Sequence, residues 1–458
     1  MRRWPVTWRL YAFPFAFDDT REHAIMTGEE PEGALDHLAL ATDLSEIVEG
    51  SHDGVPGTTG ADGTRFLESG DEAGTPPGDR KFRPDVEGLR AVAVLLVVLY
   101  HAGVPHLTGG FVGVDVFFVL SGFVITGLLL RERSATGKTG LLAFYGRRSR
   151  RILPMATLVI VVTVLASYHW LGFISGGYTA SFGKAADLFY ANFHLIATGT
   201  SYLTAQQPPS PLQNYWSLSV EEQFYVVYPT LFIVAALTVR RFDLRLKLAI
   251  LLTAGIAGSL FWSIHQSATN SVAAYFSPFT RAWELALGAL IAVGSVQLAR
   301  LPQLFAAVMT WVGLAGILVA AFMFTDATLY PGSAVGLPVI STALVVAGGT
   351  SRPAWGGESA LAIRPLQWTG RLSYSLYLWH WPILIIAAQH AGHALSVWDN
   401  LLWVLLAVML SVASHLLVEN PIRHAKFLSR SGPRSLLLGA GMVGATFGIL
   451  AAEIAGHP

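Results

Sequence analysis

Ten charged or polar side chains within or beside apolar segments are the candidates for chemistry in this chain: Arg90, His101, Asp115, Arg148, Arg151, Glu221, Glu222, Arg281, Glu284 and His380. A histidine can take a proton from a hydroxyl group, a carboxylate can orient that histidine, and guanidinium groups bind phosphate oxygens. The chain has no cysteine, which excludes thiolate zinc sites, disulfides and a cysteine nucleophile. Any catalysis must therefore use histidine, carboxylate, hydroxyl or basic groups.

Arg90 and His101 are eleven residues apart, a spacing that returns to nearly the same face of a helix about 16 Å further along its axis. Both side chains are then expected to point into one seam, the arginine at the inner end and the histidine at the outer end. The alternative is structural: Arg90 extends to the lipid headgroups and His101 is an interfacial histidine with its hydrogen bonds satisfied.

The run from Arg147 to Arg151 contains four arginines, and Arg148 and Arg151 stand at the i, i+3 spacing that places them together on a helix. Such a pair can donate several hydrogen bonds to phosphate. The alternative is that the run only marks the cytoplasmic end of a membrane helix.

The remaining candidates each have a structural alternative. Glu222 completes a capping box with Ser219, which leaves Glu221 without a structural role. Arg281 and Glu284 have the spacing of a helical ion pair, and His380 can bond the backbone group that Pro382 releases. Asp115 lies near the outer end of its apolar segment.

The elements that position these residues are predicted to be membrane helices. Of 458 residues, 53% are hydrophobic and 13% charged, against roughly 25% charged in soluble domains. Eleven apolar runs approach the ~20 residues needed to cross a bilayer. They lie at about 88–104, 111–130, 152–171, 224–239, 247–264, 281–297, 304–324, 333–349, 372–390, 398–419 and 435–455. A twelfth segment, Tyr178 to Ile196, is predicted to be an amphipathic helix on the membrane surface or in a groove.

The predicted fold is all-α: a multi-pass protein of the cell membrane with about ten core transmembrane helices and one further C-terminal span. Basic residues concentrate in alternate loops, which predicts a cytoplasmic N-terminus and an external C-terminus. Residues 1–80 hold 16 acidic and 6 basic side chains and lack periodicity, so we expect a disordered acidic cytoplasmic tail. The membrane domain is expected at 81–424, and a linker and extra helix at 425–458.

Together these stretches resemble acyltransferase family 3, a group of membrane proteins that includes bacterial surface-glycan O-acyltransferases. Arg90 and His101 are similar to the family's Arg-x10-His element, and Arg148 and Arg151 to its Arg-x-x-Arg region, although Arg147 and Arg150 also fit. Glu87 stands where the family more often has Gln. The resemblance covers about residues 81–424 and rests on six motifs in the family's order: Phe82–Ala91 with His101, Gly110–Gly122, Phe144–Pro154, Trp216–Tyr225, Arg281–Leu285 and Ser373–Pro382.

The resemblance implies an O-acyltransferase that moves an acyl group, expected to be acetyl, from acyl-CoA to a hydroxyl of a cell-surface glycan or glycolipid. In that interpretation His101 is the general base or carries the acyl group, and Glu221 or Glu222 orients it. Arg90, Arg148 and Arg151 bind the donor, and Asp115, Arg281, Glu284 and His380 support the site. Two rival classes are a transporter of the acyl donor or glycolipid and a membrane anchor for a separate outer chain.

The resemblance also predicts the partners. Some family members continue into an extracytoplasmic SGNH-type hydrolase-like domain, and no Gly-Asp-Ser segment follows the eleventh span here. We therefore expect a separate SGNH-type chain, a truncated gene, or a protein that works without that domain. The other expected partners are the bilayer, the acyl-CoA and the acceptor. We expect no permanently bound cofactor, no metal and no nucleic acid.

Overall fold

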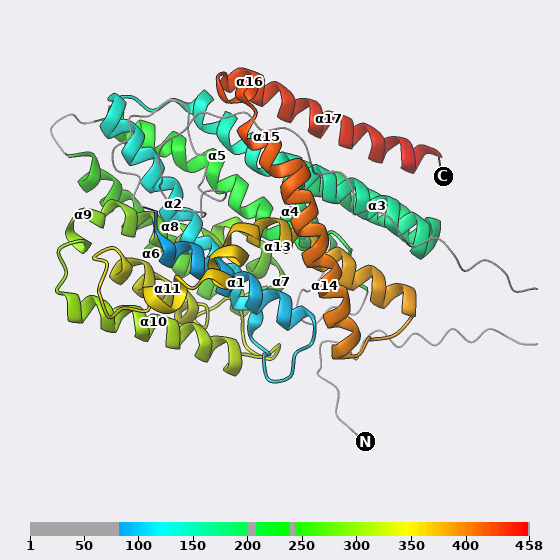
Figure 1. Cartoon of the computed structure of the whole chain (residues 1–458), viewed down its shortest axis with the longest axis horizontal. Coiled ribbons are helices and arrows are strands. Elements are labelled where there is room, and N and C mark those ends of the chain that lie inside the picture. Colours follow the sequence, from blue (N-terminus) through cyan, green and yellow to red (C-terminus); the bar gives the residue numbers. More distant parts are fainter. Residues whose placement is uncertain (1–81, 200–207, 239–242, 457–458) are drawn as a thin grey trace, which may run out of the picture. The chain divides into compact units, whose positions relative to one another are not determined.

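The computed structural model describes residues 82–199, 208–238 and 243–456. In this part of the chain every regular element is helical (Figure 1), which confirms the predicted all-α class. The acidic tail predicted for residues 1–80 lies outside the described residues.

Each of the eleven predicted spans coincides with a helix. Seven helical segments are long and apolar enough to cross a membrane, so the multi-pass architecture is confirmed. The others are shorter or more polar. The eleven helices are α1 (Pro84–His101), α2 (Gly113–Thr136), α3 (Leu141–Asp187), α5 (Tyr215–Leu237), α6 (Leu244–Thr269), α8 (Pro278–Val293), α10 (Gln303–Met323), α11 (Gly336–Gly349), α13 (Arg364–Ala391), α14 (Val397–Ser414) and α17 (Gly432–Gly456).

Short elements connect these helices. A 3₁₀ turn, η2 (Gly110–Val112), precedes α2, and a π-helical turn, η3 (His415–Glu419), follows α14. The remaining short helices are α4 (Ala191–Thr198), α7 (Ser271–Phe276), α9 (Ser295–Leu298), α12 (Glu358–Leu361), α15 (Asn420–His424) and α16 (Lys426–Ser429).

Helices α1 and α13 are parallel neighbours in the centre of Figure 1. A Cβ atom at Gly370 would lie 2.1 Å from the carbonyl oxygen of Glu87, so only glycine permits this approach. From there the two helices run together: Arg90 contacts Ser373, and His101 contacts His380. The pair thus carries polar side chains from both helices along one seam.

Helix α3 folds back on itself at Gly172, whose φ of 81° and ψ of 178° are outside the helical region. The ideal Cβ position of Gly176 lies 2.4 Å from the ring of Tyr168, and that of Gly183 lies 3.5 Å from the side chain of Ile160. Because a straight helix would separate residues 160 and 183 by about 34 Å, the two limbs form a hairpin.

The hairpin corrects the prediction of one amphipathic helix from Tyr178 to Ile196. The structure divides that segment between the second limb of α3 and α4, with a turn at residues 188–190. The segment is packed in a groove, where Asn192 is fully buried and donates to the carbonyl of Phe276 over 3.2 Å. The chain reverses at Gly172, a glycine with positive φ inside an apolar run. Hydropathy alone does not show such a reversal.

Helices α2 and α8 also approach through glycine. A Cβ at Gly288 would lie 1.9 Å from the carbonyl oxygen of Val119, and one at Gly122 would lie 1.8 Å from that of Leu285. These backbone atoms cannot move away as a flexible side chain would. The α2–α8 contact holds Asp115 beside Arg281, as described below.

We expect Gly288→Ala to lower the free energy of unfolding by about 1–3 kcal/mol, because the added methyl group overpacks the α2–α8 contact. The measurement is thermal unfolding of the detergent-solubilised protein, in which size-exclusion chromatography detects the protein that remains folded after heating. Gly255→Ala in α6 is the matched control, since its Cβ meets nothing within 4 Å. Equal melting temperatures for the two variants would contradict the assigned contact.

Candidate active site

A pair of stacked histidines occupies the seam between α1 and α13. His101, the last residue of α1, places its Nδ1 3.0 Å from Nε2 of His380, and the rings are 5.3 Å apart and nearly parallel. Both side chains are buried, and the edge of Trp381 packs against His101. The two histidines that the sequence singled out separately therefore form one dyad.

The hydrogen-bond network assigns the tautomer of each ring when both are neutral. Nδ1 of His380 lies 3.1 Å from the carbonyl oxygen of Leu376. A carbonyl oxygen only accepts, so this nitrogen carries the proton and Nε2 of His380 has the lone pair. Nδ1 of His101 must then donate to His380, which makes Nε2 of His101 the basic nitrogen.

A cluster of arginines lies further along the same seam. Arg90 donates to the hydroxyl of Ser373 over 2.9 Å and lies 3.4 Å from the carboxylate of Glu87. Arg151 lies within electrostatic range of Arg90, Arg148 and Arg423. Since Ser373 and His380 are seven residues apart on α13, about 10 Å of helix separates this arginine cluster from the dyad.

The structure distinguishes the four arginines of the Arg147–Arg151 run. Arg147 is an exposed partner of Glu132, and Arg150 donates to the carbonyl of Leu428 and the hydroxyl of Ser435, where it ties α3 to the α17 region. Arg148 and Arg151 face the protein interior together. Arg148 pairs with Glu222, and Arg151 lies near Arg90, so these two arginines have different surroundings from Arg147 and Arg150.

The structure places Glu221 and Glu222 with Arg148. Glu222 accepts from Arg148 over 3.1 Å, and Glu221 accepts from the hydroxyls of Ser121 and Tyr225. The Arg148 guanidinium also stacks 3.5 Å above the Tyr225 ring. The sequence predicts that a glutamate orients His101, but in the structure the partner of Nδ1 of His101 is His380.

Asp115, Arg281 and Glu284 form a separate, fully buried network. Nη1 of Arg281 lies 2.9 Å from Asp115 and 3.1 Å from Glu284, and the hydroxyl of Tyr330 donates to Asp115. The rings of Trp216, Tyr275 and Tyr330 surround the guanidinium. The predicted ion pair of Arg281 and Glu284 is present, and Asp115 joins it. This network supports the helix packing and does not contact the histidines.

Several polar residues of the seam escaped the sequence argument. Tyr377 bonds Ser217 over 2.6 Å, between the arginine cluster and the dyad. Ser373, Tyr377 and His380 share the i, i+4, i+7 spacing of one helix face, so a polar stripe on α13 was the available signal.

Tyr100 next to His101 donates to Asp326, a loop carboxyl group whose pKa is raised by burial. No sequence pattern connects those two residues.

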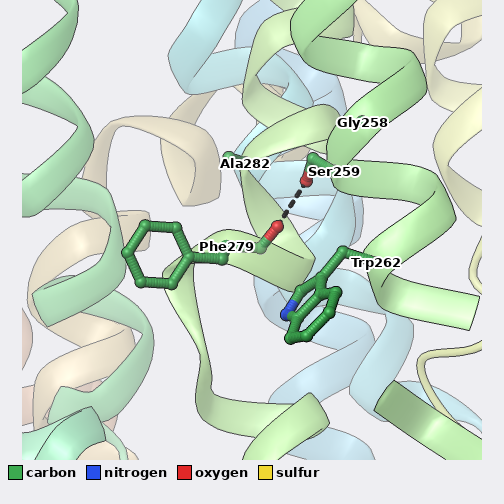
Figure 2. Close-up of a pocket in the computed structure, with 5 residues that line it drawn as sticks. All are labelled: Gly258, Ser259, Trp262, Phe279 and Ala282. Atoms are coloured by element: carbon green, nitrogen blue, oxygen red, sulfur yellow. Dashed lines mark hydrogen bonds between the residues drawn. The ribbon is translucent and has the colours of Figure 1, made fainter. Parts of the chain in front are cut away.

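An apolar groove elsewhere on the molecule is a different feature (Figure 2). Gly258, Ser259 and Trp262 of α6 line it together with Phe279 and Ala282 of α8. The Ser259 hydroxyl donates to the carbonyl of Phe279 over 2.6 Å. None of the ten candidate residues lines this groove. Across the described residues, no group of three or more His, Asp or Glu side chains is placed to hold a metal ion.

Comparison with known proteins gives several relatives of this chain. The chain is 32% identical over 368 residues to the peptidoglycan O-acetyltransferase OatA of Listeria monocytogenes, covering 76% of this chain and 57% of that protein. It is 32% identical over 365 residues to the putative peptidoglycan O-acetyltransferase YrhL of Bacillus subtilis, covering 77% and 56%. The O-acetyltransferase OatA of Staphylococcus aureus is 30% identical, with 76% and 58% covered.

The chain spans little more than half the length of these relatives. No solved structure gives a significant match. The family model of the acyltransferase domain matches residues 83–419, from the start of α1 to the end of η3, and this range includes the dyad, the buried network, and Arg90, Arg148 and Arg151. As the motifs predicted, the protein belongs to acyltransferase family 3.

Proposed function

We propose that this protein transfers an acetyl group from acetyl-CoA to a hydroxyl group of the cell-wall glycan. The observation that carries the proposal is the α1–α13 seam, which presents guanidinium groups at one end and a basic histidine at the other. A donor with an anionic nucleotide end and a distant thioester needs these two features in this order. The names of the relatives favour peptidoglycan as the acceptor.

The orientation follows from charge. The helix ends that carry Arg90 and Arg148 belong to the arginine-rich side of the protein, which the positive-inside rule assigns to the cytoplasm. The dyad then lies toward the outer side. The donor binds from the cytoplasm and the acceptor approaches from outside, so the membrane domain itself brings the two substrates together.

The chemistry assigns one step to each group. Nε2 of His101 takes the proton of the acceptor hydroxyl as its oxygen attacks the thioester carbonyl. The carbon–sulfur bond breaks, and the CoA sulfur leaves with the proton that His101 returns. Alternatively, Nε2 attacks the thioester first and passes the acetyl group to the hydroxyl in a second step. In both routes His380 accepts the Nδ1 hydrogen, which leaves the lone pair of His101 on Nε2.

The arginines and glutamates serve binding. Arg148 and Arg151 contact the phosphates of the donor, and Arg90 lines the path toward the dyad. Glu222 and Glu221 hold Arg148 in place when no donor is bound. Asp115, Arg281 and Glu284 fix α2 against α8.

We expect His101→Ala to abolish acetyl transfer and leave acetyl-CoA binding unchanged, whereas Arg151→Ala weakens binding by roughly tenfold because it removes a charge-assisted contact to phosphate. The measurement is transfer of labelled acetyl groups to cell-wall fragments, with donor affinity determined by calorimetry. His390→Ala is the matched control, since His390 also lies on α13 but is exposed and bonds the carbonyl of Trp170, away from the dyad.

The outcomes separate the alternatives. Full transfer by correctly inserted His101→Ala would rule out its catalytic role, and label retained on the denatured protein would identify the acyl-histidine route. Binding without turnover in the native chain would favour a carrier of the acyl donor or dependence on an SGNH-type partner chain. Adding such a chain distinguishes these two.

We expect His380→Ala to lower kcat by about 10- to 100-fold with little change in KM for acetyl-CoA, because His101 loses the partner that fixes its tautomer. Steady-state kinetics in the presence and absence of added imidazole tests the assignment. Partial rescue by imidazole is expected. A parallel loss of kcat, affinity and thermal stability without rescue would show that His380 only supports packing.

A further inference from the structure

The π-helical turn η3 directs one carboxylate into the arginine cluster. Pro421 has no N–H group and its ring crowds the carbonyl four residues earlier, a conflict that a wider turn relieves. In this turn Leu416 and Leu417 are exposed, whereas Glu419 is only 3% exposed. A glutamate buried at the end of a lipid-facing helix must be held by polar groups.

Two donors from different helices hold Glu419. The hydroxyl of Ser375 on α13 donates to its Oε2 over 2.8 Å, and Nδ1 of His415 lies 3.0 Å from the same oxygen. Helix α3, which carries Arg151, packs directly against η3, so Glu419 acts electrostatically on Arg151, but the two groups do not form an ion pair within 4.0 Å. The carboxylate is therefore near Arg151 but fixed to other partners.

Arg151 differs from its neighbours in the cluster. Arg90 has Glu87 as an ion-pair partner, and Arg148 has Glu222. Among the described residues, the Arg151 guanidinium makes no hydrogen bond, and three other guanidiniums repel it. A guanidinium with unused donors in a positive environment is suited to an incoming anion.

We infer that Glu419 is a positioning residue that keeps Arg151 available for a donor phosphate and limits how tightly that phosphate is held. Ser375 and His415 prevent the carboxylate from closing onto Arg151. Its negative charge nevertheless opposes the anion, and this matters because CoA leaves with the same phosphates that acetyl-CoA brings. The inference rests on the proposed donor site and adds to it a device for product release.

The inference predicts opposite effects for two substitutions. Glu419→Gln removes the opposing charge but keeps an oxygen for Ser375, so CoA should bind roughly five- to tenfold tighter. Ser375→Ala releases Glu419 toward Arg151, so CoA should bind roughly three- to tenfold weaker. In the double variant of Glu419→Gln and Ser375→Ala, the Ser375 substitution should not change CoA affinity further, because residue 419 no longer carries a negative charge.

The experiment is calorimetric titration of CoA into the full-length purified protein and its variants, followed by CoA inhibition of acetyl transfer. Glu419→Gln should lower KM for acetyl-CoA and strengthen CoA inhibition, with kcat reduced as release slows. Glu132→Gln is the matched control, since it makes the same change of charge in the exposed Arg147 pair, and it should leave CoA affinity unchanged.

Three results would overturn the inference: weaker or unchanged CoA binding by Glu419→Gln, tighter binding by Ser375→Ala, or an equal effect of the Ser375 substitution in both backgrounds. Thermal melting of each variant identifies a purely structural role, which would lower stability and affinity together. Failure of the proposed donor site is distinguishable, because the native protein would then not bind CoA at all.

Discussion

The backbone contact between α1 and α13 is the constraint on which the site depends. Gly370 lets α13 approach the carbonyl of Glu87, and this approach sets the register of two parallel helices. With the register fixed, Ser373 lies opposite Arg90 and His380 opposite His101. A shift by one residue would rotate each side chain by about 100° and separate both pairs at once. One close contact therefore positions both ends of the seam.

The membrane interior makes each polar group costly, and the protein meets that cost in three ways. The two histidines can remain neutral because each completes the other's hydrogen bonding. The Arg281 network is closed by two carboxylates and three aromatic rings, which leaves it sealed from water. In the arginine cluster, the Arg151 guanidinium makes no hydrogen bond to another described residue. The network that supports packing thus pairs its charges with one another, whereas Arg151 has no ion-pair partner among the described residues.

The sequence predicted the membrane helices well because apolar length is a local property. It also placed Arg90 and His101 on one face, since both belong to the same helix. The sequence does not show which helices contact one another. Glu221 or Glu222 was predicted to orient His101, but in the structure both carboxylates lie beside Arg148. Helical spacing shows which residues share one face of a helix, but it does not show which other helix packs against that face. The turn at Gly172 was missed for a related reason, because hydropathy does not record backbone direction.

Helix α17 lies along the first limb of α3, joined by close contact of Gly146 with Gly432 and of Gly439 with Ser149. Arg150 adds hydrogen bonds to the carbonyl of Leu428 and the hydroxyl of Ser435. In the sequence Arg150 stands between Arg148 and Arg151, the two arginines proposed to bind the acyl donor. A tilt of α17 would therefore change the positions of Arg148 and Arg151, because the contacts of α17 lie on the same turns of α3.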